Sequence, residues 1–270
     1  MEKYSLLLSV YHRERSEYLE LSLRSVFNQT VVPTEVVLVK DGPLTKELDA
    51  VISEYSSKYS VLKVFTLPQN QGLGKALNEG LKHCSYDLVA RMDTDDIAKP
   101  NRFEKQLEVF KNHPKIDIVS SWIDEFEGNI NHITSIRKVP EFHREIYKYA
   151  KKRCPINHPA VMFRKSAVLA AGGYKHFPLF EDYYLWVRML MNGAKFYNIQ
   201  ESLLYFRTSI DMFKRRGGWN YAINEYKLQK EFKNIGFINN IDFFYNISVR
   251  FISRILPNRL RTIFYKTMLR

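Results

Sequence analysis

Short apolar segments alternate with amphipathic segments through the first 90 residues. Between the apolar segments, hydrophobic residues recur at helical spacing, as at Leu19, Leu23 and Val26. Short buried strands separated by helices of about three turns indicate βαβ units and a parallel sheet covered on both faces. The predicted strands are residues 5–10, 35–39, 61–65 and 87–90, and the predicted helices are residues 17–28, 45–58 and 72–83.

The second half of the chain is less regular. Residues 116–120 and 160–163 have strand character, and residues 166–171 and 181–192 have helical character. A length of 270 residues suits one large α/β domain with an appended tail. We therefore predict an α/β fold with a mostly parallel central sheet flanked by helices and a helical C-terminal extension. The predicted divisions are residues 1–100, residues 101–241 of the same domain, and a tail of residues 242–270.

Composition limits the class of protein. Cys84 and Cys154 are the only cysteines and are far apart, which disfavours a disulfide framework or a thiolate metal site. We see no signal peptide and no apolar run that could span a bilayer, so we expect a cytoplasmic protein. The net charge of +12 suggests an anionic membrane or a polyanion as partner. No nucleic-acid-binding module is recognisable, so we expect no nucleic-acid partner.

Three acidic residues, Asp93, Asp95 and Asp96, directly follow the fourth predicted strand. Ligands of open α/β sheets bind beyond the carboxyl ends of the strands. Residues two apart in an extended segment project to the same side, so Asp93 and Asp95 can face one ligand. Hard divalent cations take one or two carboxylates together with phosphate oxygens, which suits a nucleotide diphosphate. The alternative is a solvated acidic turn before the helix that begins near Pro100.

In this context the sequence resembles the family 2 glycosyltransferases, which have the GT-A (Rossmann-like) fold. The resemblance spans roughly residues 4 to 208, and the order and spacing of its segments make it specific. Those segments are residues 8–11 (LSVY), 23–30 (LRSVFNQT), 35–42 (EVVLVKDG), 70–80 (NQGLGKALNEG), 90–96 (ARMDTDD), 100–103 (PNRF), 157–164 (NHPAVMFR), 172–174 (GGY) and 181–182 (ED).

The resemblance implies a role for each acidic residue of the cluster. Asp93 and Asp95 match the DxD element of the family. It implies that Asp93 contacts the nucleotide ribose and that Asp95 holds Mn²⁺ or Mg²⁺ on the diphosphate. Asp96 makes the element a DxDD variant and shares the metal in this interpretation.

The resemblance also implies three further contacts with the nucleotide. Asp41 would accept a hydrogen bond from N3–H of a uracil, and Tyr11 would lie beside the base. Lys75, at the start of a helix preceded by glycines, would reach the base or a phosphate, since free N–H groups at such a helix end attract anions. The alternatives are a turn residue for Asp41, strand-end packing for Tyr11 and a surface lysine for Lys75.

Glu181 and Asp182 precede an aromatic-rich helix, where acidic residues also serve as caps. By resemblance, Asp182 is the catalytic base that takes a proton from the acceptor hydroxyl, and Glu181 is the other candidate for that role. One base opposite the leaving group implies inversion, hence a β-linked product from an α-linked donor. His158 and Trp186 are acceptor-site candidates, with structural packing as the alternative for both.

Two basic segments remain. Arg215 and Arg216 are candidates to close over the diphosphate, with a solvated loop as the alternative. The tail of residues 242–270 mixes aromatic and basic residues, which is typical of segments that lie on an anionic membrane. The alternative is a pair of C-terminal helices that packs on the main domain.

These features predict an inverting, metal-dependent glycosyltransferase at the inner face of the cell membrane. The resemblance implies a UDP-hexose donor, galactose or glucose, and a lipid-diphosphate-linked glycan acceptor in surface polysaccharide synthesis, such as O-antigen or capsule. A sugar-nucleotide nucleotidyltransferase is an alternative, but the glycine-rich basic loop that it needs after the first strand is absent from residues 11–15. A catalytically silent binding protein on the same fold is the other alternative.

Overall fold

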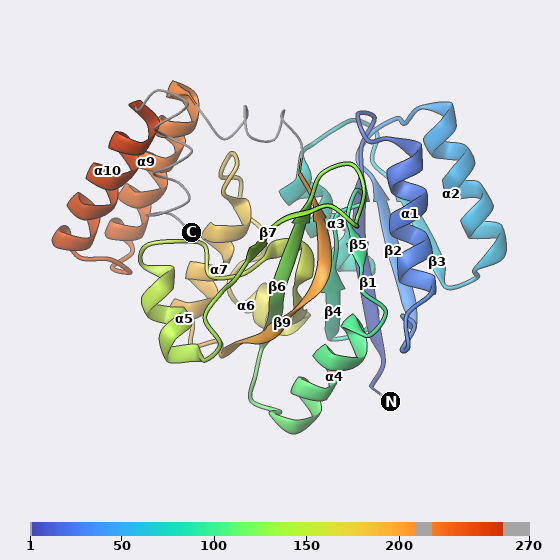
Figure 1. Cartoon of the computed structure of the whole chain (residues 1–270), viewed down its shortest axis with the longest axis horizontal. Helices are drawn as coiled ribbons and strands as arrows, with labels where there is room; N and C mark the ends of the chain where they lie inside the picture. Colours follow the sequence, from blue (N-terminus) through green and yellow to red (C-terminus); the bar gives the residue numbers. More distant parts are fainter. Residues whose placement is uncertain (1, 209–217, 256–270) are drawn as a thin grey trace.

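The computed structural model describes residues 2–208 and 218–255, and within them a nine-stranded sheet lies between two layers of helices (Figure 1). The strands are β1 (Tyr4–Val10), β2 (Glu35–Lys40), β3 (Leu62–Thr66), β4 (Leu88–Arg91), β5 (Ile97–Ala98), β6 (Ile118–Phe126), β7 (Ile133–Arg137), β8 (Met162–Arg164) and β9 (Phe196–Arg207). The helices are α1 (Ser16–Phe27), α2 (Lys46–Lys58), α3 (Leu73–His83), α4 (Arg102–Asn112), α5 (His143–Ala150), η1 (His158–Ala160), α6 (Lys165–Ala170), α7 (Glu181–Met191), α9 (Trp219–Asn234) and α10 (Asn240–Ile255).

The sheet has a parallel half and a mixed half. Its order is β3-β2-β1-β4-β8-β6-β9-β5, and β7 also pairs with β6, along residues 123–126. The strands β3, β2, β1 and β4 are parallel throughout. Strand β8 is antiparallel to both β4 and β6, whereas β6 and β9 are parallel. The α/β sheet predicted from the sequence is confirmed, and the antiparallel pairs are confined to its second half and edges.

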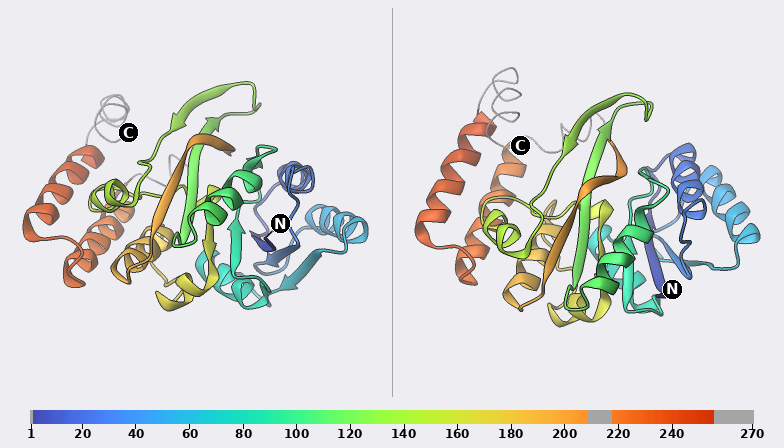
Figure 2. Two further views of the ribbon diagram at one scale, coloured as in Figure 1. Left: turned by 90° about the horizontal axis from the view of Figure 1, so that it is seen from below. Right: turned by 60° about the horizontal axis from the view of Figure 1, so that its bottom comes forward.

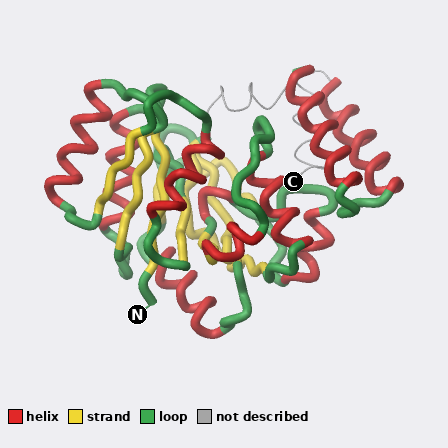
Figure 3. Tube along the Cα trace, turned by 180° about the vertical axis from the view of Figure 1, so that it is seen from behind, coloured by secondary structure: helices red, strands yellow, loops and turns green. Residues whose placement is uncertain are grey.

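Alternation along the strands decides which helices cover which face. On β1, Leu6 and Leu8 pack into a core with α1, α2 and α4. Leu7 points to the opposite face, where α3, α5, α6 and α7 and part of the C-terminal helices form the second core. Because successive strand residues face opposite sides, a continuous apolar run is what a doubly covered strand requires. Figure 3 shows the strands between these helices.

The C-terminal extension is a pair of helices, α9 and α10, which lie side by side at the end of the molecule opposite α1 and α2 (Figures 1 and 2). The buried Asn246 of α10 donates to Gln229 Oε1 at 2.8 Å and to the carbonyl of Lys151 at 2.7 Å. Arg250 forms an ion pair with Glu225 of α9, and its side chain is 14% exposed. The described part of the tail therefore packs on the domain, and Arg250 points inward rather than toward a lipid surface.

No helix within residues 2–208 and 218–255 combines the length and the apolar character needed to cross a membrane. The segment after Ile255 lies outside the described residues, so the proposed function of the remaining tail stays a prediction. The same holds for the division of the chain at residues 100 and 241.

Candidate active site

Three adjacent parallel strands bring the first candidate residues to one edge of the sheet. Tyr11 follows β1, Asp41 follows β2 and Asp93 follows β4, and these strands are neighbours in the order β2-β1-β4. The carboxyl ends of parallel strands meet at one edge, which is where open α/β sheets bind their ligands. The topology thus gathers residues that are up to 82 positions apart in the sequence.

The acidic cluster lies in the turn between β4 and β5. Asp93, Asp95 and Asp96 each offer a carboxylate oxygen, and these oxygens lie within 4.8 Å of one another. Asp96 is fully buried, and its Oδ2 has no hydrogen-bond partner in the described part of the chain. Burial, followed by the charges of Asp93 and Glu14, raises the pKa of Asp95 to about 7. Crowded carboxylates with an unpaired buried oxygen form an all-oxygen set, which fits a hard divalent cation such as Mg²⁺ or Mn²⁺.

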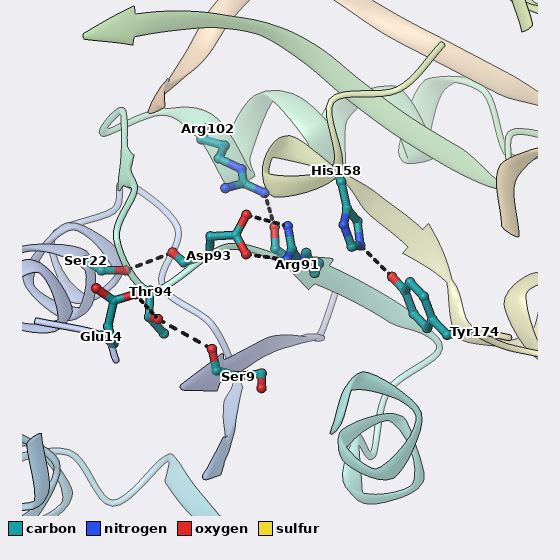
Figure 4. Close-up of polar contacts among 9 residues, drawn as sticks. All are labelled: Ser9, Glu14, Ser22, Arg91, Asp93, Thr94, Arg102, His158 and Tyr174. Carbon is teal, nitrogen blue, oxygen red and sulfur yellow. Dashed lines mark hydrogen bonds and ion pairs between the residues drawn. The ribbon is translucent and has the colours of Figure 1, made fainter. Parts of the chain in front are cut away.

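Two buried arginines, Arg91 and Arg102, lie beside Asp93 (Figure 4). Both guanidinium nitrogens Nη1 and Nη2 of Arg91 donate to the carboxylate of Asp93, with Nη1 at 2.9 Å from Oδ2. Arg102 donates from Nη2 to the carbonyl of Arg91 at 2.7 Å, and both arginine side chains are almost inaccessible to solvent. Ser22 Oγ donates to the carbonyl of Asp93 at 3.3 Å. Asp93 is therefore held at both its side chain and its backbone.

Glu14 is a fourth carboxylate at this site, and it was not among the residues predicted from the sequence. It lies in the loop between β1 and α1, and the hydroxyl of Thr94 lies 3.3 Å from its Oε2 (Figure 4). Burial, with a smaller contribution from the charge of Asp93, raises the pKa of Glu14. Its position shortly after the first strand is the one sequence signal that marks it.

Asp41 is buried, and each of its carboxylate oxygens accepts one backbone N–H from the loop before α3. Oδ1 accepts from Gln71 at 2.7 Å, and Oδ2 accepts from Gly72 at 3.0 Å. Asp41 thus holds the loop that leads into the N-terminus of α3, where Lys75 is exposed on the first turn. The predicted contacts of Asp41 and Lys75 with a nucleotide stay predictions, as does that of the half-buried Tyr11.

The two candidate bases, Glu181 and Asp182, begin α7, and Glu181 faces the N-terminal turn of α3. A methyl group added at Gly74 of α3 would lie 3.2 Å from Cγ of Glu181, so the glycine permits this close approach. Burial raises the pKa of Glu181. The thiol of Cys154 donates to Oδ2 of Asp182 at 3.8 Å. The fold therefore brings the candidate bases beside the helix whose preceding loop is held by Asp41.

His158 and Trp186 occupy the interior next to these groups. His158 Nε2 lies 2.9 Å from the hydroxyl of Tyr174 (Figure 4), and the rings of His158 and Trp186 meet edge to face at 5.7 Å. Burial, together with the charge of Arg91, lowers the pKa of His158 well below its usual value, so the imidazole is neutral at pH 7. Trp186 is fully buried and also contacts Phe163. Its burial supports the packing alternative for Trp186.

Arg207, the last residue of β9, is the second site residue that sequence reasoning missed. Its backbone N–H donates to Oδ1 of Asp96 at 2.8 Å, and its Nε donates to the carbonyl of Asp95 at 2.9 Å. No sequence signal marked it, because the strand that carries it was not predicted. Arg215 and Arg216, the predicted candidates for the diphosphate, lie outside the described residues.

Two known structures share this fold. The chain superposes on S. aureus TarS 1–349 in complex with UDP-GlcNAc with a TM-score of 0.67 and 18% identity, covering 94% of this chain and 72% of that one. It superposes on the mannosyltransferase PcManGT from Pyrobaculum calidifontis, in complex with GDP-Man and Mn²⁺, with a TM-score of 0.62 and 14% identity, covering 98% and 73%. At these identities the likeness establishes the fold alone.

The sequence comparisons are more specific. The family model described as "Glycosyl transferase family 2" matches residues 5–169, and "Glycosyl transferase family group 2" matches residues 88–269. The chain is 43% identical over 268 residues to the Escherichia coli UDP-Gal:alpha-D-GlcNAc-diphosphoundecaprenol beta-1,3-galactosyltransferase, covering 99% of this chain and 97% of the relative. It is 36% identical to the Erwinia amylovora amylovoran biosynthesis glycosyltransferase AmsE, covering 97% and 98%. With the strand-end acidic cluster in place, these matches establish that this chain belongs to glycosyl transferase family 2.

Proposed function

We propose that the chain transfers a hexose, galactose rather than glucose, from its UDP-sugar to a lipid-diphosphate-linked glycan with inversion at the anomeric carbon. The observation that carries this proposal is the three-aspartate cluster beyond β4 in a chain 43% identical over nearly its whole length to a UDP-galactose-dependent enzyme. The name of that relative also supplies the acceptor class, a sugar on diphosphoundecaprenol, and the product linkage, which is β.

The donor is assigned to the edge formed by β2, β1 and β4. We assign the uracil to Tyr11 and Asp41, the ribose to Asp93, and the diphosphate to Lys75 and the acidic cluster. Asp95 and Asp96 would hold Mn²⁺ or Mg²⁺, which supplies positive charge against the leaving diphosphate when bound. The ion pair with Arg91 supports the role of Asp93, because it fixes the carboxylate before a ligand arrives.

The acceptor side is assigned to α7 and η1. Asp182 takes the proton of the acceptor hydroxyl as that oxygen attacks the anomeric carbon, and Glu181 orients the acceptor. The neutral His158, held by Tyr174, lines this side. Trp186 would shape the pocket from behind, because its ring is fully buried.

A lipid-linked acceptor requires the enzyme to work at a membrane surface, which we propose is the cytoplasmic face of the cell membrane. Support comes from exposed apolar side chains on each of the two C-terminal helices. Trp219 is 66% exposed, Ile241 79% and Phe244 65%. We call the following six exposed residues the α9–α10 face: Trp219, Ile223 and Tyr226 of α9, and Ile241, Phe244 and Tyr245 of α10. Exposed aromatic and aliphatic side chains near basic ones are typical of segments that lie in a membrane interface.

Release of UDP from a panel of UDP-sugars, with and without Mn²⁺, tests the proposed activity. The acceptor in this assay is a GlcNAc-diphosphate lipid. We expect turnover with UDP-galactose that depends on the metal and is lost in Asp95→Ala. The matched control is Glu108→Gln, which removes an exposed carboxylate of α4 and should leave turnover unchanged.

This assay and two further measurements separate the alternatives. Turnover with UDP-glucose but not UDP-galactose reassigns the donor sugar. Production of a UDP-sugar from UTP and a sugar phosphate supports the nucleotidyltransferase. Absence of turnover with every donor, in a protein whose melting temperature still rises with UDP, supports the silent binding protein.

A further inference from the structure

Arg207 joins the acidic loop to the second half of the sheet. It ends β9 and lies beside Phe126, the last residue of the neighbouring strand β6. From there its backbone N–H reaches Oδ1 of Asp96 at 2.8 Å, and its side-chain Nε reaches the carbonyl oxygen of Asp95 at 2.9 Å. One residue from a distant part of the chain thus fixes both the carboxylate of Asp96 and the backbone of Asp95.

The surroundings of Arg207 hold its guanidinium in one place. Nη1 donates to the carbonyl of Gly128 at 3.3 Å. The guanidinium carbon lies 3.8 Å from the ring centre of Tyr18 on α1 and 4.6 Å from that of Phe126. Only 8% of the residue is exposed. Because these two rings already hold the guanidinium of Arg207, its side chain loses little further conformational freedom when it donates to the acidic loop.

We infer that Arg207 is a positioning residue that holds Asp95 and Asp96 in the geometry needed to bind a divalent cation. Groups that hydrogen-bond to metal-binding residues orient them, and their loss typically lowers metal affinity by about 10- to 100-fold. The positive charge of Arg207 also offsets part of the repulsion among the three carboxylates. This inference rests on the proposed metal dependence.

Arg164 of β8 provides a control, because it makes similar contacts near the amino ends of the parallel strands, away from the acidic cluster at their carboxyl ends. Its Nε donates to the carbonyl of Ile116 at 3.2 Å, and its guanidinium carbon lies 5.4 Å from the ring centre of Phe110. Arg164 pairs with Leu88, the first residue of β4, whereas the acidic cluster follows the last. Loss of this arginine removes a hydrogen bond to a backbone carbonyl, a contact with an aromatic ring and an ion pair with Asp87, without touching the acidic loop.

The test measures the dissociation constant of Mn²⁺ in the presence of UDP, by electron paramagnetic resonance of the free ion, together with the melting temperature of the metal-free protein. Arg207→Met removes the Nε contact with Asp95 and the positive charge but keeps the backbone N–H that binds Asp96. We expect this variant to bind Mn²⁺ about 10- to 100-fold more weakly. Saturating Mn²⁺ should restore most of its kcat. Arg164→Met should lower the melting temperature but leave the dissociation constant unchanged.

Arg207→Lys keeps the charge but not the planar fork, so we expect a smaller loss of Mn²⁺ affinity than in Arg207→Met. If Arg207→Met does not fold, Arg207→Lys decides the question, and an unchanged dissociation constant overturns the inference. Wild-type affinity in Arg207→Met, with only a lower melting temperature, overturns it as well. A wild-type protein that binds no Mn²⁺ overturns the proposed metal dependence itself, which is a distinguishable result.

Discussion

The two carboxylates at the start of α7 have different surroundings, which supports the different roles proposed for them. Oδ2 of Asp182 accepts from the thiol of Cys154, whereas burial raises the pKa of Glu181. Asp182→Asn should lower kcat by about a hundred- to ten-thousand-fold, because amides cannot take the acceptor proton. Glu181→Gln keeps hydrogen-bonding capacity and should mainly raise KM for the acceptor. Steady-state kinetics of both variants measure kcat and KM for the acceptor, with UDP affinity as the control for intact donor binding. A loss of kcat in Glu181→Gln and a raised KM in Asp182→Asn would exchange the two roles.

Glu35 at the start of β2 makes a pH-dependent contribution to stability. Burial acts to raise its pKa, but hydrogen bonds from Lys63, Ser85 and Ser5 outweigh burial and lower the pKa to about 2. A lowered folded-state pKa stabilises the protein above the unfolded value of about 4.5, and this contribution is lost as the pH falls from about 4.5 toward 2. Glu35→Gln should therefore destabilise by about 3 kcal/mol at pH 6.

Urea unfolding at pH 6, 5 and 4 measures this contribution. The difference in free energy of unfolding between the wild type and Glu35→Gln should begin to shrink at pH 4, where the unfolded chain takes up the proton. The exposed Glu108→Gln variant serves as the control and should differ little from the wild type at any of these values. A Glu35→Gln deficit that does not change with pH would contradict the assigned pKa.

At the level of single residues, the sequence predicted the acidic cluster but not all of its neighbours. Asp93, Asp95 and Asp96 were recognisable because they follow a buried strand directly, and topology then brings them to the ligand-binding edge. The contacts of Arg207 with the cluster depend on packing between distant segments, whereas Arg91 is only two residues from Asp93. An arginine in a sequence carries no mark that distinguishes a buried ion-pair partner from a solvated surface group.

Helix α3 lies against the sheet through a glycine. A methyl group added at Gly80 would lie 2.3 Å from Cδ1 of Leu7 and 2.8 Å from Cγ2 of Val39, and both of these neighbours are fully buried. Overpacking of this kind costs about 1–3 kcal/mol, more than the roughly 1 kcal/mol that alanine gains over glycine in helix propensity. Gly80→Ala should therefore lower the free energy of unfolding.

Urea unfolding compares Gly80→Ala with Ser53→Ala, a substitution at an exposed position of helix α2. The control should be neutral or slightly stabilising. Stabilisation by Gly80→Ala would mean that α3 can move away from the sheet without loss. Because Asp41 holds the loop before α3, a displaced helix should also weaken UDP binding, which thermal shift can detect.

The elements differ in how far local sequence determines them. Strands β1, β2 and β4 were predicted because burial on both faces requires apolar runs. Strand β9 was missed because polar residues interrupt it. Asn198 is nevertheless buried, since it donates to the carbonyls of Pro140 and Pro155. The strand forms by pairing with β6 over long sequence distances, and local propensity does not report such pairing.

For the whole molecule, the two halves of the sheet divide the proposed work. Asp41 and the acidic cluster follow strands of the parallel half. His158 and Asp182 lie in η1 and α7, the elements that directly precede strands β8 and β9 of the mixed half. Strand β8 joins the halves by pairing with both β4 and β6. Arg207 of β9, in the mixed half, donates hydrogen bonds to Asp95 and Asp96 in the loop that follows the parallel half. The proposed donor site therefore depends on residues from both halves of the sheet.

The α9–α10 face is the part of the molecule that we propose contacts the membrane holding the lipid-linked acceptor. Tyr221 of α9 contacts Phe180, the residue before Glu181, with ring centres 5.0 Å apart. The helix pair therefore adjoins the candidate bases, and a face that enters the membrane interface would bring them near lipid-linked sugars. We predict that the wild type binds vesicles containing phosphatidylglycerol and that Trp219→Glu with Phe244→Glu abolishes this binding, because each charge must leave water.

Sedimentation with vesicles measures this binding, and kcat on a short, soluble GlcNAc-diphosphate acceptor shows whether the site is intact. The double variant should keep that kcat while losing turnover on the acceptor embedded in vesicles. Leu169→Glu, at a 54% exposed position on α6, changes an apolar residue away from the face and should bind vesicles like the wild type. If the double variant sediments with vesicles as the wild type does, contact with the membrane is made elsewhere, and the apolar side chains of α9 and α10 have another partner.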